Sequence, residues 1–244
     1  MWCKVAAMWL TIGLLLLWSG CSAPHDNPLD PASKHYVAPP AEAPSLSARA
    51  SSLHISRNFG TDSYSVICEL YGSDAALQDS AWVTFDTSDA VSLSRTDPNT
   101  LATVFASSYF QDPHLNDVLG RPFLFTSKDN HGTVHHVGPV YMWRVIETVP
   151  ELTSPTSSDT VDSHPKFSWH PFTATYPFGY LAEVINVTEG FETLAWTSPL
   201  EPESVLFVDY PDSLPDGDYY WTLSVVDSFQ NSARSKEGDF TVRG

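Results

Sequence analysis

Three closely spaced histidines are the clearest candidates for metal chemistry in this sequence. His131, His135 and His136 surround one expected turn, and imidazole is a common ligand of transition metals. His135 and His136 are adjacent on an expected strand, so their side chains point to opposite faces and cannot readily share one ion. The pattern therefore favours a solvated turn over a metal site. His164 and His170, which flank another expected strand, are assigned structural or surface roles.

A second group of candidates is the acidic loop that contains Asp212, Asp216 and Asp218, with Asp209 nearby. Calcium prefers several oxygen ligands on a bent loop. The spacing matches no EF-hand, and turns that lead into strands are commonly acidic. Calcium binding and an ordinary turn therefore both stay open for this loop.

Motifs for catalysis are absent from the sequence. It has no Gly-x-Ser-x-Gly turn, no His-Glu-x-x-His helix and no Gly-rich phosphate loop. The 29 acidic residues are numerous enough that a glycosidase-like carboxylate pair, about 5–10 Å apart, would arise by chance. We therefore expect neither an enzyme nor a metal or other cofactor, and we keep an enzyme of unrecognised type as an alternative.

Aromatic side chains in expected loops are candidates for stacking on sugar rings. Tyr109 and Phe110 lie in one irregular stretch, and Tyr176, Phe178 and Tyr180 surround a Pro and a Gly in another. The same side chains are suited to closing the ends of two hydrophobic cores. We favour this interpretation and keep sugar stacking as the alternative.

The elements that position these residues are expected to be short strands. The sequence has 19 prolines and 42% hydrophobic residues, and no long helical pattern follows the first twenty residues. Frequent turns between short apolar runs are typical of all-β folds. The formal net charge of −17 makes nucleic-acid binding unfavourable and would also repel anionic lipid headgroups.

The strand expected within residues 216–227 is the strongest of these elements. Apolar and more polar residues alternate along it, so one face is buried and the other is wetter. We expect Trp221 to pack against Trp169 across a sandwich, and the Tyr219 hydroxyl to bond the preceding loop as a corner tyrosine does. Trp169, Tyr219 and Trp221 are therefore the predicted structural core.

The N-terminal residues 1–20 have the pattern of a secretory signal peptide. One Lys precedes an apolar run of 13 residues from Val5 to Leu17, which is shorter than the roughly 20 residues of a membrane span. The following Leu-Trp-Ser-Gly before Cys21 resembles a bacterial lipobox. That resemblance implies a diacylated lipoprotein anchored at Cys21, and Ser22 in place of Asp implies sorting to the outer membrane. An ordinary cleaved signal followed by a chance Cys is the alternative.

Residues 21–49 are predicted to be a disordered tether. They are rich in Pro, Ala, Ser and Asp, and nothing in them alternates. The segment Asn27–Pro31 resembles one that is common just after the lipid Cys of bacterial lipoproteins, and we interpret it as spacer.

Residues 50–148 are predicted to form a first, immunoglobulin-like sandwich. Turn residues separate about seven apolar runs, which is the strand count of such a domain. Cys68 is the only Cys after position 21, so the chain cannot form the inter-sheet disulfide of antibody domains. We expect Cys68 to be a buried free thiol.

Residues 149–244 resemble bacterial fibronectin type III domains. The shared features are an early Phe-x-Trp, a Leu-x-x-Gly turn, a strand that begins with Tyr-x-Trp, an Asp/Asn hairpin and a closing Phe-x-Val. Gln230 stands where the hairpin usually has Gly, which supplies a positive φ. We therefore expect either Asn231 to take that conformation or the turn to be longer.

These expectations define an all-β protein of two tandem immunoglobulin-like, fibronectin type III-like sandwiches after a signal peptide and tether. Such a chain is expected to be a non-enzymatic, lipid-anchored surface protein that binds a protein or a polysaccharide through loops or sheet edges. The alternative binding function is a carbohydrate-binding accessory module. Because sandwiches host many roles, the ligand cannot be read from the fold.

Overall fold

The computed structural model describes residues 45–86 and 88–244. The predicted signal peptide, the predicted lipidation site Cys21 and nearly all of the predicted tether therefore lie outside the described residues. In the part that is described, no helix has the length and apolar character that crossing a membrane requires.

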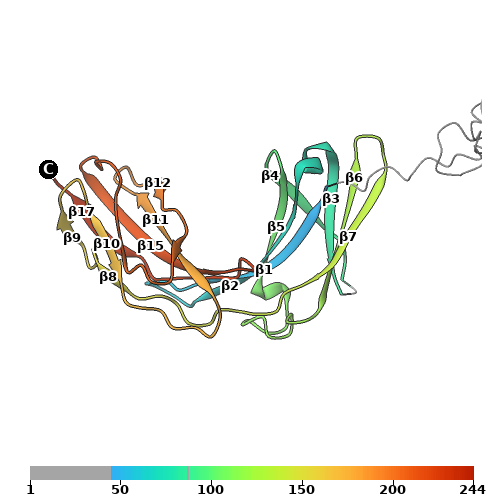
Figure 1. The fold of residues 1–244 in the computed structure, drawn as a ribbon, viewed down its shortest axis with the longest axis horizontal. Coiled ribbons are helices and arrows are strands. Elements are labelled where there is room, and N and C mark those ends of the chain that lie inside the picture. Colours follow the sequence, from blue (N-terminus) through green and yellow to red (C-terminus); the bar gives the residue numbers. More distant parts are fainter. Residues whose placement is uncertain (1–44, 87) are drawn as a thin grey trace, which may run out of the picture. The chain divides into compact units, whose positions relative to one another are not determined.

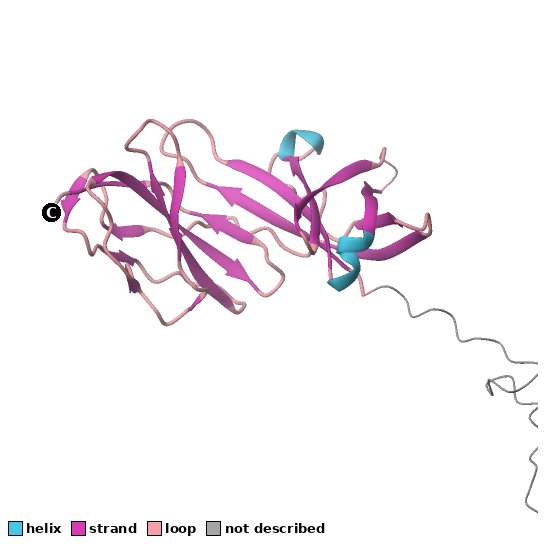
Figure 2. Cartoon of the chain, turned by 90° about the horizontal axis from the view of Figure 1, so that it is seen from above, coloured by secondary structure: helices cyan, strands magenta, loops and turns pink. Residues whose placement is uncertain are grey.

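Nearly all of the regular secondary structure in the described chain is β-strand, which confirms the predicted all-β class (Figure 2). Two short 3-10 helices, η1 (Ser73–Leu77) and η2 (Ser107–Tyr109), lie between strands. Residues 45–244 form one compact unit that contains two separate buried cores. The cores change between Met142, which belongs to the first, and Ile146, which belongs to the second.

The first core lies between two antiparallel sheets, as expected for an immunoglobulin-like sandwich (Figure 1). In each sheet, alternate side chains point inward, as Tyr64, Val66, Cys68 and Leu70 do. One sheet contains β1 (Ser47–Ile55), β2 (Ser63–Tyr71) and β5 (Thr100–Ala106), and the other contains β3 (Gln78–Phe85), β6 (Pro122–Asp129) and β7 (Val134–Tyr141). The strand β4 (Val91–Asp97) pairs with both β5 and β3 and so joins the two sheets at one edge.

The second core also lies between two sheets, and its central strand is the one predicted from the alternating pattern. The smaller sheet contains β8 (Leu152–Ser154), β10 (Lys166–Trp169) and β14 (Phe207–Asp209). The larger contains β11 (Phe178–Asn186), β12 (Thr193–Thr197), β15 (Gly217–Asp227), β16 (Ser232–Arg234) and β17 (Gly238–Val242). Two short strands extend it: β13 (Glu201–Pro202) pairs with β11, and β9 (Asp159–Val161) runs parallel to β17.

The predicted core residues lie in this second core. Trp169, Tyr219 and Trp221 are all buried. The ring centroids of Trp169 and Trp221 are 6.4 Å apart, and the Tyr219 hydroxyl donates a hydrogen bond to the carbonyl oxygen of Pro215 at 3.0 Å. The Trp221 ring also donates through Nε1 to the Pro155 carbonyl at 2.7 Å, so its one polar atom is satisfied although the side chain is buried.

Strand β1 belongs to both sandwiches, and this corrects the predicted end of the tether. The strand begins at Ser47, inside the segment 21–49 assigned to the tether. Its whole length pairs with β2, and its last three residues also pair in parallel with β16, from Leu53 opposite Ser232 to Ile55 opposite Arg234. Residues 47–49 form a strand despite a composition that resembles a linker, because β2 is a ladder partner for their backbone.

The hairpin after β15 corrects a second expectation. Gln230 itself adopts the positive φ, at 64°, and neither of the two expected alternatives is needed. Its amide donates to the carbonyl of Asp227 at 3.0 Å. The turn therefore keeps its length and places a non-glycine residue in the left-handed region.

Candidate ligand-binding site

A pocket of about 290 Å³ opens at one end of the first sandwich. Two segments form it: the end of β3 with the turn that follows it, and residues 107–121, which connect β5 to β6 and contain η2. The volume is at the lower end of the range for small-molecule sites, which suits one ring-sized group. The lining residues are Phe85, Asp86, Ser88, Tyr109, Phe110, Gln111, Asp117 and Arg121.

Aromatic rings form one wall of this pocket. Tyr109 is held by Phe105 and Phe110, with ring centroids 4.8 and 5.4 Å away, while 45% of its surface stays exposed. Phe110 packs edge-on against buried Phe85 at 5.3 Å. The wall is thus anchored in the core and presents a rigid, half-exposed aromatic surface to the solvent.

Polar groups also line the pocket. The Arg121 guanidinium pairs with Asp86 and lies over the Phe85 ring, 4.9 Å from its centroid. Asp117 Oδ2 accepts a hydrogen bond from the Gln111 amide at 3.0 Å. The pocket therefore combines an aromatic surface with an Arg donor and carboxylate acceptors.

Sequence reasoning found only the aromatic part of this site. Tyr109 and Phe110 were named as sugar-stacking candidates, whereas Asp86, Asp117 and Arg121 were missed. Asp86 follows β3, whereas Asp117 and Arg121 lie in the β5–β6 connection, and the three residues match no motif. The one available signal was an irregular stretch rich in aromatic and polar residues, which is typical of functional loops.

The other aromatic candidates close the second core. Tyr180 is fully buried, and Phe178 packs edge-on against it at 5.3 Å. Tyr176 is covered by the Arg144 guanidinium, 3.8 Å from its ring centroid. These contacts make the three residues part of the second core or of the layer that covers it.

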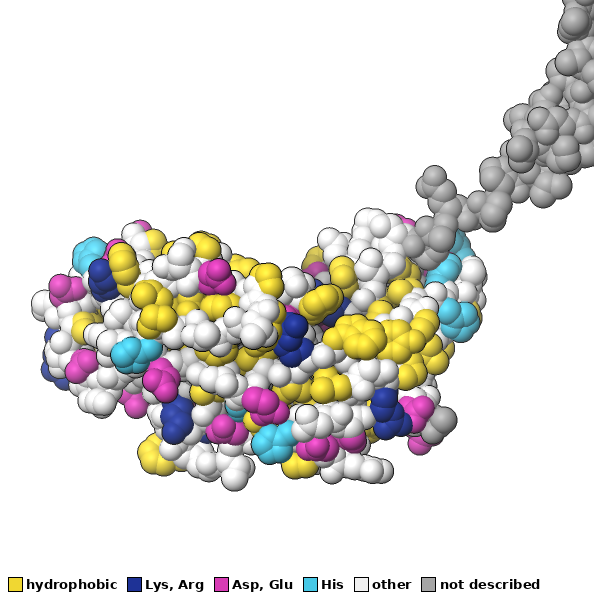
Figure 3. Space-filling view, turned by 60° about the horizontal axis from the view of Figure 1, so that its bottom comes forward, with side chains coloured by type: hydrophobic (Ala, Val, Ile, Leu, Met, Phe, Trp, Pro, Cys, Tyr) yellow, Lys and Arg dark blue, Asp and Glu magenta, His cyan; other side chains and the backbone are white. Residues whose placement is uncertain are grey.

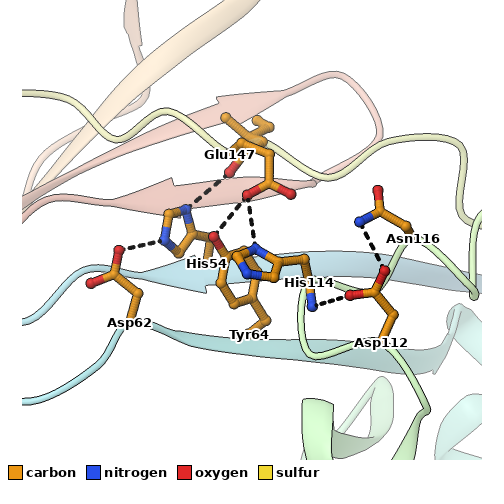
Figure 4. A network of polar contacts seen from close by, with 8 residues as sticks. His54, Asp62, Tyr64, Asp112, His114, Asn116 and Glu147 are labelled. Carbon is orange, nitrogen blue, oxygen red and sulfur yellow. Dashed lines mark hydrogen bonds and ion pairs between the residues drawn. The ribbon is translucent and has the colours of Figure 1, made fainter.

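A polar network connects β1 and β2 to the segment after β7 (Figure 4). Buried His54 lies between the Ile146 carbonyl oxygen and Asp62 Oδ2, each 3.1 Å from a ring nitrogen. Its ring stacks on Tyr64, with centroids 4.2 Å apart. The Tyr64 hydroxyl in turn donates to Glu147 Oε2 at 2.7 Å. The network therefore ties the first sandwich to the start of the second core.

The network also extends to the loop that carries the pocket (Figure 4). His114 Nδ1 lies 3.5 Å from Glu147 Oε2, and its backbone amide donates to Asp112 Oδ1 at 2.7 Å. Asn116 donates to the other Asp112 oxygen at 3.0 Å. These bonds fix the loop between η2 and Asp117 from within.

The protonation states of Asp62 and Tyr64 favour stable hydrogen bonds within the network. Burial alone raises the pKa of Asp62, but hydrogen bonds from His54 and Ser56 outweigh it and hold that pKa below its usual value. Burial and the Glu147 carboxylate raise the pKa of Tyr64, so its hydroxyl remains a donor. Ser56 donates to Asp62 and not to His54, so these contacts do not place a hydroxyl for activation by the imidazole.

The histidine cluster and the acidic loop are each held by local hydrogen bonds. His135 Nε2 lies 2.9 Å from Asp129 Oδ2, whereas His136 contacts Thr126 at 3.2 Å. Asp216 accepts from the Gly244 amide at 3.0 Å, and Asp218 accepts from Thr241 at 2.9 Å. Across residues 45–86 and 88–244, no three His, Cys, Asp or Glu side chains are grouped to hold a metal ion.

Cys68 is a free, fully buried thiol in β2. Burial raises its pKa above the usual value, so the reactive thiolate form is disfavoured. The side chain fills the first core as a small apolar group.

No protein-family model matches the sequence, and no curated protein matches it. Among solved structures, the FN1–FN3 domains of chicken CNTN1 align with 12% identity over 81% of this chain and 69% of that chain, at a TM-score of 0.34. The fibronectin(III)-like modules of Clostridium thermocellum CbhA align with 10% identity over 81% of this chain and 92% of that chain, at a TM-score of 0.29.

Proposed function

We propose that this protein is a non-enzymatic, lipid-anchored surface protein whose first sandwich binds a polysaccharide. The observation that carries the proposal is the pocket beside Tyr109. A sugar ring has apolar C–H faces and a rim of hydroxyl groups, and the pocket offers an aromatic wall and polar partners at the sizes these require.

The polar side of the pocket supports binding of hydroxyl groups in particular. Asp86 and Asp117 bring carboxylate groups, which accept hydrogen bonds from hydroxyls, to the lining of the pocket. Arg121 and Gln111 add donors to the same lining.

The charge of the chain narrows the class of polysaccharide. The net charge is −17, which repels uronate- or sulfate-bearing chains. The proposed ligand is therefore a neutral polysaccharide.

The sequence supports an anchor for this binding module at Cys21. Acyl chains on that residue would hold the protein at the bacterial outer membrane, because each buried methylene contributes about 0.8 kcal/mol. Cys21→Ser should move the protein from the membrane fraction to the soluble fraction. A Cys21→Ser protein that still sediments with outer membranes would contradict the lipoprotein proposal.

The pocket itself is tested by Tyr109→Ala. The native protein should retard in affinity gels that contain soluble xylan, mannan or mixed-linkage glucan, and the variant should lose at least about tenfold in affinity. The matched control is Phe229→Ala, which removes an exposed ring from the second sandwich and should bind as the native chain does. If the native protein binds none of these polysaccharides, the proposed function is wrong.

An edge of the second sandwich favours a protein partner as the second candidate. Among the described strands, β12 pairs only with β11, and Phe191 and Leu194 on this edge are exposed by 77% and 59%. An open, apolar edge strand suits the addition of a partner strand. A protein that cross-links to the native chain but not to Leu194→Lys would support this candidate, and equal cross-linking to both would contradict it.

A further inference from the structure

Two aromatic rings project side by side from the end of β7 in the first sandwich. The ring centroids of Tyr141 and Trp143 are 5.4 Å apart, and the ring planes are inclined by 34°. Met142 between them is buried, whereas Tyr141 and Trp143 are exposed by 38% and 64%. The alternation of an extended chain thus sends one side chain into the core and both rings into solvent.

This pair is not needed for the core, since the rings lie outside it. A large exposed apolar surface next to polar groups is typical of an interaction site. Figure 3 shows such a gathering of hydrophobic side chains, beside charged ones, in the right half of the view.

The aromatic pair adjoins the pocket through a single glycine. The Gly120 amide donates to the Met142 carbonyl at 2.9 Å. A Cβ atom on Gly120 would lie 3.7 Å from the Trp143 ring, so the ring covers this residue directly. The next residue, Arg121, lines the pocket and lies over the Phe85 ring. The two aromatic surfaces are therefore separated by one short, ordered segment.

We propose that Tyr141 and Trp143 form a second binding platform, which takes further sugar rings of the same neutral polysaccharide that enters the pocket. This inference rests on the proposed function and specifies its ligand as a chain that is bound along its length. Two adjacent rings at a small angle match consecutive sugar units that are turned relative to one another. The polar contacts of the pocket would determine which sugar is bound. The platform would raise the affinity for chains that are long enough to reach it.

A polysaccharide is favoured over a protein here because of what surrounds the rings. The platform adjoins a pocket that Asp86, Asp117 and Arg121 also line, so an occupant of both must be amphipathic along its whole length. Alternate apolar faces and hydroxyl edges give a polysaccharide that property. A protein partner would use the rings without the pocket.

The test compares ligands of different lengths. The native protein, Tyr109→Ala and Trp143→Ala are titrated calorimetrically with the oligosaccharide series, from monosaccharide to hexasaccharide, of a neutral polysaccharide that the native chain binds. Native affinity should rise with length. Trp143→Ala should lose at least about tenfold for the hexasaccharide and nothing for the monosaccharide, whereas Tyr109→Ala should weaken both.

The controls separate the two proposals. Phe229→Ala should follow the native protein at every length, and an unchanged thermal midpoint of Trp143→Ala shows that the variant is folded. If Trp143→Ala binds the hexasaccharide as the native chain does while Tyr109→Ala does not, the platform is wrong and the pocket stands. If the native protein binds none of the panel, the proposed function fails and the platform with it.

Discussion

The carboxylate of Asp227 is fully buried and lies 2.7 Å from Nη1 of Arg144. Asp227 stands at the end of β15 in the second sandwich, whereas Arg144 follows β7 of the first. The same carboxylate accepts hydrogen bonds from the amide and the side chain of Asn231, at 2.9 and 3.0 Å. Asn231 in turn accepts from the amide of Ser52 in β1 at 2.9 Å. One buried acid therefore connects a hairpin turn to both segments that reach it from the first sandwich.

Asp227→Ala should lower the free energy of unfolding by about 3 kcal/mol or more. The substitution removes the acceptor of several buried N–H groups and of Arg144 at once. Urea denaturation followed by tryptophan fluorescence measures the loss. Glu189→Ala, at an exposed loop carboxylate, is the control and should change stability by no more than about 0.5 kcal/mol. A loss below about 1 kcal/mol for Asp227→Ala would contradict this role.

Trp221→Ala should cost about 3–5 kcal/mol, because it opens a cavity where a fully buried ring contacts Phe167, Trp169 and the Pro155 carbonyl. Trp143→Ala removes the same side chain from an exposed position and should cost no more than about 0.5 kcal/mol. The comparison requires only the unfolding midpoints of the two variants. Equal losses would mean that the second core is not organised around Trp221.

Asp129 should titrate at an unusually low pH. Its hydrogen bond to His135 lowers the pKa of the carboxyl group to about 2. A lowered folded-state pKa contributes stability above the usual value of about 3.9, and that contribution is lost as the pH falls toward 2. The titration of the side-chain carboxyl signal by NMR measures the midpoint directly. In His135→Ala the midpoint should move up toward the usual value, and an unchanged midpoint would exclude His135 as the cause.

Gln230→Gly should stabilise the second sandwich by roughly 0.5–1 kcal/mol. Gln230 has a φ of 64°, and an L-residue in this region carries a penalty of about 1–2 kcal/mol, which glycine escapes at some cost in chain entropy. Thermal unfolding of the two proteins measures the difference. Gln230→Val should be destabilising, since β-branched residues are poorly tolerated at positive φ. If Gly and Val variants behave alike, the turn is not strained at this position.

The fold was largely predictable because strands that bury one face have a local pattern. The alternation in residues 216–227 marked β15 and its buried residues Tyr219 and Trp221 before any partner strand was known. The start of β1 was not predictable in the same way. Its first residues have a linker-like composition and become a strand only because β2 is available as a ladder partner.

The pocket was the least predictable feature, and the reason is geometric. Phe85 ends β3, whereas Tyr109, Asp117 and Arg121 belong to the connection between β5 and β6, and nothing in the spacing of these two segments says that they meet at one end of the first sandwich. Likewise, nothing in the sequence indicates that the Trp143 ring lies against the backbone of Gly120, next to the pocket.

The sequence by itself determined the all-β class, the central strand of the second sandwich and its aromatic core, because periodicity and turn residues act over a few neighbours. Only the tertiary structure decided that β1 joins both sandwiches through β16, that Asp227 meets Arg144, and that Phe85 and Asp86 meet Phe110 and Arg121 in one pocket. These relationships join residues far apart in the chain, and they depend on how sheets and loops pack, which no local pattern encodes.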